Sequence, residues 1–372
     1  CLREILRLGL YELLFQSTPT HAAVDEYVEL AKQALRPGAG NLVNGVLRTI
    51  DRDREHIPTP DTGDDAEDLA LRYSHPSWMV ARWLDRFGLD DTTELLRANN
   101  RRPMYSVRVN PLRASHAEVT DWLDKHDVVH VDSPYLDNHL RLKRLQVLIE
   151  EGLLDDGRVA VQDESAGLVV QLLDPQPGDT VIDGCAAPGG KAMHAAARME
   201  GTGTLLAIDA QADRLDRVEQ AAETHGVDDL VQTKAADLRV WATSPDPPQA
   251  DRVLVDVPCT GLGVLAKRAD LRWRRSPEDL EEMAALQDEL LDAAARLVRP
   301  GGLLLYSTCT TEPEENEHRI DAFLARHVEF TLESAEGHVP DEMVSDAGFL
   351  TTLPHEHRTD GAFAARLRRV AS

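Results

Sequence analysis

From about residue 159 onward, short apolar segments alternate with stretches of helical periodicity. The apolar segments at 180–183, 205–209, 252–256 and 303–308 have the length and composition of buried strands. Residues 210–225 and 277–298 carry apolar side chains at helical spacing between them. Strands that alternate with helices form a parallel sheet with helices on both faces. We therefore expect residues 159–372 to form a Rossmann-like α/β domain with a mostly parallel, doubly wound sheet.

A glycine-rich turn follows the first of these strands, with the sequence Asp183-Gly-Cys-Ala-Ala-Pro-Gly-Gly-Lys191. Its small residues let a ligand approach the backbone, and the helix that follows offers unpaired N–H groups. It is not a phosphate-binding loop, because Cys185 replaces the first glycine and Ala192 stands where Ser or Thr would hold magnesium. It also lacks the GxGxxG pattern of dinucleotide sites.

Two acidic residues follow later strands. Asp209 ends the strand after the glycine turn, where a carboxylate can accept hydrogen bonds from ribose hydroxyls, and Asp237 ends a further strand, where it can meet an adenine ring. Taken singly, each acid is explained as well by a turn or a helix cap. A glycine turn with these acids, but without a dinucleotide or Walker pattern, favours S-adenosylmethionine as the cofactor.

Two cysteines also stand at strand ends. Cys259 follows Asp256-Val-Pro, and Cys309 follows Ser307-Thr308. In an open parallel sheet, both would face the crevice that contains the glycine turn. A single cysteine at such a place is more often a small buried apolar residue. Two of them beside an aspartate in the predicted cofactor crevice favour chemistry instead.

The net charge of -25 argues against nucleic acid as a partner, and with only six lysines it is typical of a protein that works in high salt. Two stretches depart from this average. Residues 72–113 hold eight arginines against four acids, and residues 267–275 hold five bases against one. Aromatic residues lie among them, which suits unstacked RNA bases and their phosphates. The alternative is that the tryptophans are core residues and the arginines a solvated helix face.

Residues 1–57 read as helices, with a loop expected at 36–40, and residues 58–71 read as a linker rich in Pro, Gly and Asp. The chain begins at Cys1 rather than Met, so we expect this helical domain to be incomplete. Residues 105–110 read as a strand within a small connecting α+β region, 72–158.

These motifs, in this order and spacing, resemble the Nop/Sun family of RNA 5-methylcytosine methyltransferases. The matching segments are 183–191, 256–259, 307–309 and the closing Asp360-Gly-Ala-Phe-Ala-Ala-Arg366. Residues 1–57 resemble part of a NusB-like domain, and residues 105–110 resemble the RNA-contacting segment, as in the RsmB (Sun/Fmu) branch. The resemblance implies a class I methyltransferase fold and S-adenosylmethionine-dependent methylation of cytosine C5 in small-subunit (16S) rRNA.

The resemblance also implies roles for individual residues. Cys309 would be the nucleophile that adds to cytosine C6, Cys259 would assist product release, Asp256 would contact the base, and Lys191 would lie near base and cofactor. DNA enzymes of related chemistry use the cysteine of the Pro-Cys pair, so the choice of Cys309 rests on resemblance. The implied cofactor contacts are Asp183, Cys185, Ala186, Ala187, Pro188, Gly189, Gly190, Lys191, Asp209, Arg214, Asp237 and Asp256. The expected RNA contacts are Arg101, Arg102, Arg108, Asn110, Arg272 and Arg274.

We expect no metal site, no membrane segment, a cytoplasmic monomer, and rRNA or a pre-ribosomal particle as the partner. Three alternatives stay open. One is an rRNA-binding assembly factor without activity, a second is a methyltransferase acting on another RNA such as tRNA, and a third is a methyltransferase for small molecules or proteins. The paired cysteines and the arginine-aromatic stretch argue against the third.

Overall fold

The computed structural model describes residues 1–58 and 60–371. Two compact units divide the chain between Arg72 and Tyr73. Position 59, within the expected linker, lies outside the described residues. In the part of the chain that is described, no helix is long and apolar enough to cross a membrane.

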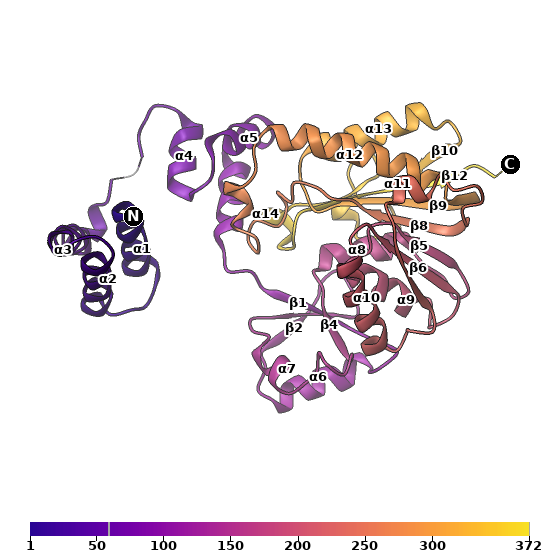
Figure 1. Cartoon of the computed structure of the whole chain (residues 1–372), viewed down its shortest axis with the longest axis horizontal. Helices are drawn as coiled ribbons and strands as arrows, with labels where there is room; N and C mark the ends of the chain where they lie inside the picture. Colours follow the sequence, from indigo (N-terminus) through magenta and orange to yellow (C-terminus); the bar gives the residue numbers. More distant parts are fainter. Residues whose placement is uncertain (59, 372) are drawn as a thin grey trace. The chain divides into compact units, whose positions relative to one another are not determined.

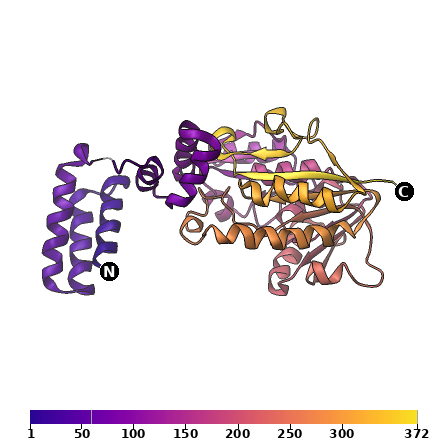
Figure 2. The ribbon, with the colours of Figure 1, turned by 90° about the horizontal axis from the view of Figure 1, so that it is seen from above.

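Three helices make up the core of the first unit: α1 (Leu2–Phe15), α2 (Thr20–Ala34) and α3 (Pro37–Arg52). They lie side by side (Figure 2) and bury apolar side chains such as Leu13, Val24 and Leu47 between them. The expected loop at 36–40 is wrong, because Pro37 begins α3, where the first helical residue needs no N–H partner. The short η1 (Arg54–His56) and α4 (Asp65–Tyr73) follow.

The second unit begins with a small antiparallel sheet and its helices. The strands pair in the order β2-β3-β1-β4. Their bounds are β1 (Tyr105–Val109), β2 (His130–Asp132), β3 (His139–Leu142) and β4 (Val159–Val161), and the helices are α5 (Ser77–Asn100), α6 (His116–Lys125) and α7 (Gln146–Glu150). The expected strand at 105–110 is confirmed as β1. Side chains of this sheet and of α6 form their own apolar core.

An eight-stranded sheet forms the centre of the second unit, in the order β10-β12-β9-β8-β5-β6-β7, with β11 paired to β12 (Figure 1). Its strands are β5 (Thr180–Asp183), β6 (Thr204–Asp209), β7 (Val231–Ala235), β8 (Ala250–Asp256), β9 (Val298–Thr308), β10 (Phe330–Glu333), β11 (Leu350–Thr352) and β12 (Ala362–Arg369). The pairs from β9 to β7 are parallel, and those of β12 are antiparallel. The expected mostly parallel sheet is confirmed.

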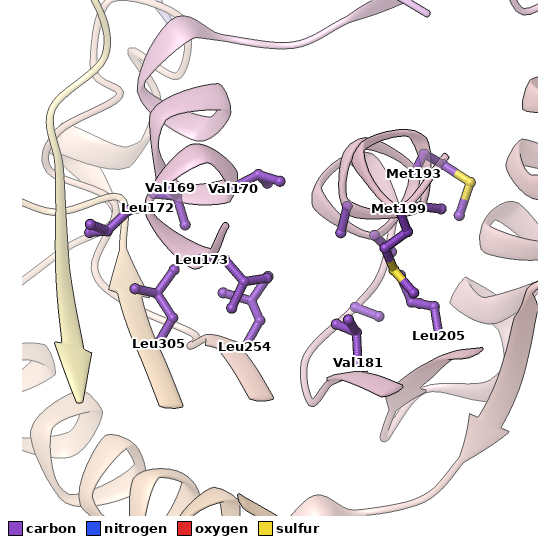
Figure 3. Packing of buried hydrophobic residues seen from close by; sticks show 14 of the residues in the cluster. Val169, Val170, Leu172, Leu173, Val181, Met193, Met199, Leu205, Leu254 and Leu305 are labelled. Atoms are coloured by element: carbon purple, nitrogen blue, oxygen red, sulfur yellow. The ribbon is translucent and has the colours of Figure 1, made fainter. Parts of the chain in front are cut away.

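Helices cover both faces of this sheet. One layer contains α8 (Glu164–Leu173), α9 (Gly190–Arg198) and α10 (Ala212–His225), and the other contains α11 (Leu238–Trp241), α12 (Glu278–Ala295) and α13 (Glu317–Arg326). Figure 3 shows the first layer, where Leu173 of α8 faces Leu254, and Met199 lies close to Val181 and Leu205 below α9. α14 (Pro354–His357) contacts α5. The double-sided cover fixes which edge of the sheet stays open for a site.

Candidate active site

The carboxyl ends of four neighbouring strands meet at one edge of the large sheet. The chain passes from β5 through β6 to β7 and then returns to the other side of β5 as β8. The strand order therefore reverses between β5 and β8, and ligands of open α/β sheets bind at such a point. Asp183, Asp209 and Asp256 end β5, β6 and β8, and Cys309 directly follows β9.

The glycine turn between β5 and α9 is held by backbone contacts. The Ala186 N–H donates to the Ile208 carbonyl at 2.9 Å, which ties the turn to β6. Gly189 has φ of 106°, a left-handed conformation that favours glycine. A Cβ atom on Gly184 would lie 2.7 Å from a methyl group of Leu238, so a larger residue there would require the Leu238 side chain to shift. The turn is thereby fixed beside the strand ends.

A cavity of about 470 Å³ opens beside this turn. Six of the predicted cofactor contacts line it: Cys185, Ala187, Asp209, Arg214, Asp237 and Asp256. The other six predicted contacts do not line it: Asp183, Ala186, Pro188, Gly189, Gly190 and Lys191. Both Cys259 and Cys309 line its wall. The cavity therefore joins the predicted cofactor crevice to the predicted reaction centre.

Sequence reasoning missed much of the cavity wall. These further lining residues are Gly184, Ala210, Gln211, Ala236, Leu238, Arg239, Val257, Pro258, Leu286 and Leu290. Gly184, Ala210 and Val257 directly follow the aspartates that end β5, β6 and β8, and this position after a strand could have identified them from the sequence. Leu286 and Leu290 of α12 are four residues apart on one helix face, and only the packing of α12 on the sheet shows that they face a ligand.

The two acids after β6 and β7 serve the backbone as well as the cavity. Asp209 accepts the Gln211 N–H at 2.9 Å and the Ala187 N–H at 3.2 Å, so it fastens the glycine turn. Asp237 caps α11 by accepting the Arg239 N–H at 2.9 Å, as the helix-cap alternative predicts. Because each carboxylate has several acceptor sites, these bonds leave room for ligand hydroxyls or amines.

Lys191 and Asp256 form an ion pair at 2.7 Å between Nζ and Oδ2. The other oxygen of Asp256 accepts the Ser307 hydroxyl at 2.8 Å. Burial lowers the pKa of Lys191, but the attraction of Asp256 outweighs it, and the net pKa is raised. Lys191 therefore stays charged and fixes the Asp256 carboxylate at the cavity wall.

The sulfur atoms of Cys259 and Cys309 lie 3.2 Å apart. The pairing of β8 with β9 brings them together, because Asp256 lies opposite Ser307 in the parallel register. Cys309 is exposed and Cys259 is half-buried. The hydrogen bond to Cys309, followed by burial, raises the pKa of Cys259 well above its usual value. Cys259 is thus held as a protonated thiol beside an accessible Cys309.

A buried carboxylate supports the loop that carries Cys259. Glu315 accepts hydrogen bonds from the Thr260 N–H and from Gln287 Nε2, both at 2.9 Å. Gln287 also donates to the Pro258 carbonyl at 2.9 Å, and burial raises the pKa of Glu315. Glu315, Gln287 and Thr260, whose hydroxyl also donates to Glu315, are positioning residues for the two cysteines that sequence reasoning missed. They lie in three separate segments of the chain, so no local motif marks them.

Three of the six expected RNA contacts are buried in this structure. Arg108, Asn110 and Arg272 are each more than nine-tenths buried. Asn110 donates to the carbonyls of Gly157 and His225, and so joins the small sheet to α10. Arg108 lies opposite His139 on β3, in a buried polar cluster with no carboxylate partner for its guanidinium among the described residues. A buried group cannot reach an RNA in this structure.

Arg101, Arg102 and Arg274 are exposed, and their contact with RNA stays a prediction. The basic stretch at 72–113 offers fewer side chains for RNA binding than its charge indicates, because some of them bind within the protein. Arg82 binds Glu312 and Glu314, and Trp83 is buried with its Nε1 donating to Glu312 at 3.0 Å. For Trp83, the alternative of a core tryptophan is confirmed. By contrast, the Trp273 side chain in the second stretch is 64% exposed.

Arg272 instead ties α5 to the segment after Cys259. Its Nη1 donates to the Ser74 carbonyl and Asn100 Oδ1, and its Nη2 donates to the Asn99 carbonyl, at 2.8–3.1 Å. We expect Arg272→Ala to lower the free energy of unfolding by about 3 kcal/mol, because buried acceptors lose a charged donor. Chemical denaturation checks this. Arg268→Ala, at an exposed ion pair, is the control and should change stability by less than about 0.5 kcal/mol. Equal effects of the two variants would contradict the assigned role.

Asp183 gives the site a pH-dependent stability. Burial and repulsion by Asp256 raise its pKa to about 7 from an ordinary 3.8. The folded state therefore binds the Asp183 proton more tightly than the unfolded state does. The stability that protonated Asp183 contributes is full below pH 3.8 and is lost as the pH rises to about 7. We expect Asp183→Asn to increase the free energy of unfolding by about 2 kcal/mol more at pH 8 than at pH 5. Denaturation at both pH values measures this, with exposed Asp216→Asn as control. The same increase at both pH values would contradict it.

The sequence and the fold of this chain match those of known proteins. The family model for the 16S rRNA methyltransferase RsmB/F matches residues 170–368, which hold the glycine turn, both cysteines and the whole cavity wall. The chain belongs to this family. A NusB family model matches residues 1–52, and a model for the ferredoxin-like domain of RsmF/B-like methyltransferases matches residues 75–147. The resemblance drawn from the motifs, and the fold it implies, are confirmed.

Relatives in this family span nearly all of the chain. A probable ribosomal RNA small subunit methyltransferase B from Bacillus subtilis is 34% identical, over 98% of this chain and 82% of the relative. One from Synechocystis is 37% identical, over 99% and 83%. Among solved structures, PH0851 has a TM-score of 0.84 at 34% identity over 99% of this chain and 82% of its own. NSun6 from Pyrococcus horikoshii with SFG, 23% identical over 80% and 99%, has a TM-score of 0.71 and shares the fold.

Among the described residues, no group of three or more His, Cys, Asp or Glu side chains is placed to hold a metal ion. The reactive side chains at this site are the thiols, the carboxylates and the lysine. Those groups suit nucleophilic addition and proton transfer.

Proposed function

We propose that this protein methylates C5 of a cytosine in small-subunit (16S) rRNA, with S-adenosylmethionine as methyl donor. The observation that carries the proposal is the pair of cysteine sulfurs, 3.2 Å apart, in the same cavity as Asp209 and Asp256. Methyl transfer to oxygen or to a ring nitrogen does not need a thiol beside the cofactor. Transfer to cytosine C5 does, because that carbon is a poor nucleophile until a thiolate adds to C6.

The cavity suits the proposed cofactor. Its volume of about 470 Å³ lies in the range of small-molecule sites. Asp209 offers carboxylate oxygens for the ribose hydroxyls, and Leu238, Leu286 and Leu290 offer an apolar surface for the adenine ring. When bound, S-adenosylmethionine supplies an electrophilic methyl group on its sulfonium.

The first chemical step forms a bond between Cys309 Sγ and cytosine C6. Cys309 is exposed at the cavity wall, so a base that has left its stack can reach it. Asp256, held by Lys191 and Ser307, faces the same space and can hydrogen-bond the edge of the base at N3 and N4. Cys309 adds as the thiolate, after its proton has passed to solvent, and the electron pair that moves onto the ring makes C5 nucleophilic. C5 would then take the methyl group as the bond between the methyl group and the donor sulfonium breaks, which leaves a neutral thioether.

The second step releases the product. C5 loses its proton to a base, the C5–C6 double bond forms again, and the bond between C6 and Cys309 breaks. Cys259 is held protonated 3.2 Å from the departing sulfur, so it can donate a hydrogen bond or its proton to that thiolate. Without this donor the covalent adduct should persist.

Two further candidates compete with this function. An rRNA-binding assembly factor would use the NusB-like helices and the exposed Trp273 without chemistry, and a tRNA methyltransferase would use the same site on another RNA. The intact set of Cys259, Cys309, Asp256 and Lys191 favours an active enzyme. We place the reaction in the cytoplasm, on rRNA or a pre-ribosomal particle, with the protein acting as a monomer.

Transfer of radiolabelled methyl from S-adenosylmethionine tests the proposal. The acceptors are deproteinised 16S rRNA lacking the modification, an immature small-subunit particle and a bulk tRNA fraction, each at low and at molar salt. We expect label in 16S rRNA only. Label in tRNA alone would contradict the substrate. No label on rRNA or on an immature small-subunit particle, with cofactor binding intact, would favour the assembly factor.

A further inference from the structure

A second cavity, of about 260 Å³, lies in the second unit and shares no residue with the cofactor cavity. The end of α5 with the turn after it, β3, the residue before α8, the segment after Cys259, and the turn before β12 form its walls. Five cationic side chains line it: Arg101, Arg102, Arg141, Lys267 and Arg358. In a chain of net charge -25, such a concentration of cations is exceptional.

Two of these cations are not engaged within the protein. Arg141 binds Glu164 through two guanidinium nitrogens, and Arg101 lies 3.4 Å from Glu94. The side chains of Arg102 and Arg358 are exposed and have no hydrogen-bond or ion-pair partner among the described residues. Their guanidinium groups are therefore free to bind an external anion.

Both acids of this cavity are paired with one internal cation. Lys267 Nζ binds both Asp163 and Asp360, the two carboxylates that line the wall. The Asp360 N–H also donates to Asp163 Oδ1 at 3.1 Å, which fixes the group. Lys267 offsets one of these two negative charges, and the five cations of the wall outnumber its two acids, so an anion that enters the cavity meets the charge of the arginines.

Backbone hydrogen bonds connect this cavity to the nucleophile. The Gly263 N–H donates to the Cys309 carbonyl at 3.1 Å, and the Gly361 N–H donates to the Gly263 carbonyl at 2.8 Å. A Cβ atom on Gly263 would lie 2.2 Å from the Gly361 carbonyl oxygen, so this crossing admits only glycine. Gly361 directly follows Asp360 in the cavity wall. Two backbone hydrogen bonds thus join the wall of the cationic cavity to Cys309.

We propose that this cavity binds the sugar-phosphate backbone of single-stranded RNA next to the target nucleotide, with Arg102 and Arg358 donating to phosphate oxygens. The inference rests on the proposed function. A planar guanidinium matches the paired oxygens of a phosphate, and the side chain of Met104, 44% exposed in the same wall, offers an apolar contact for a base. An acidic protein segment would also complement the positive charge of the cavity. The backbone connection of the cavity to Cys309 favours the RNA substrate as its occupant.

The test compares the wild-type protein with Arg102→Gln/Arg358→Gln. The control is Arg217→Gln/Arg296→Gln, which removes two other exposed arginines whose side chains have no hydrogen-bond or ion-pair partner among the described residues. The probe is a short fluorescein-labelled single-stranded RNA, titrated by anisotropy over a range of KCl. We expect the test variant to bind about ten-fold more weakly at low salt, with a salt slope reduced by about 1.4 for two lost phosphate contacts. The control should bind as the wild type does, and all three should bind S-adenosylmethionine equally.

Equal RNA affinity and salt slope in the test variant and wild type would overturn the proposal, as would failure of the wild type to bind the probe. Displacement of the RNA by a short glutamate-rich peptide at equal concentration would also overturn it, in favour of an acidic protein partner. Failure of methyl transfer alone is a separate outcome. RNA binding by the wild type that depends on Arg102 and Arg358, without methylation, would support this RNA-binding surface and contradict the proposed reaction.

Discussion

Cys309→Ala is expected to reduce methyl transfer by at least about a thousand-fold, because no other exposed thiol in the cavity can add to cytosine C6. The affinity for S-adenosylmethionine should stay within a few fold of the wild type. The substitution removes one sulfur at the rim of the cavity and leaves Asp209, Asp237 and the glycine turn in place. Single-turnover transfer of labelled methyl measures the first quantity, and calorimetry measures the second.

The control for this variant is Cys1→Ala, which removes an exposed thiol outside the second unit and should leave turnover unchanged. A variant that lost cofactor binding as well would report damage to the cavity instead of loss of the nucleophile. Turnover near the wild-type level in Cys309→Ala would contradict its assigned role and would transfer that role to Cys259.

Cys259→Ala is expected to give the opposite behaviour, with addition and methyl transfer intact and release blocked. Its thiol is the donor that lies 3.2 Å from the departing sulfur of Cys309. Without it, protein and RNA should remain joined through the bond between Cys309 and C6. On a denaturing gel we expect most of the rRNA fragment to migrate with the protein after one turnover, whereas the wild type should release it.

The double variant Cys259→Ala/Cys309→Ala separates a true adduct from tight binding, since it has no sulfur with which to form the bond. It should give free RNA on the same gel. Free RNA with the single variant Cys259→Ala would contradict a role in release. A joined band in the double variant would show attachment through another residue.

The site motifs were predictable because each lies within a short segment next to a strand. The turn from Asp183 to Lys191 and the two cysteine motifs needed only the general rule that parallel strands end at one edge. The 3.2 Å contact between the sulfurs follows from the pairing of Asp256 with Ser307, and β8 and β9 are neighbours in both sequence and sheet. The fold of the catalytic part was accessible for the same reason.

Tertiary packing decided the features that sequence reasoning missed or got wrong. Local charge did not distinguish Arg272, buried under α5, from Arg274, which is exposed two residues later. Burial of Arg108 depends on helices that contribute His194 and His225, more than 80 residues away in the chain. The cationic cavity needed five segments to converge, and sequence reasoning did not single out Arg358.

Bisulfite sequencing of 16S rRNA after reaction with the wild-type protein tests the central claim most directly. Unmodified cytosines are converted by bisulfite, and a cytosine methylated at C5 is protected. The account predicts one newly protected cytosine in the wild-type reaction and none in a parallel reaction with Cys309→Ala. Labelled rRNA in which every cytosine is still converted would place the methyl group on another atom and would contradict the account.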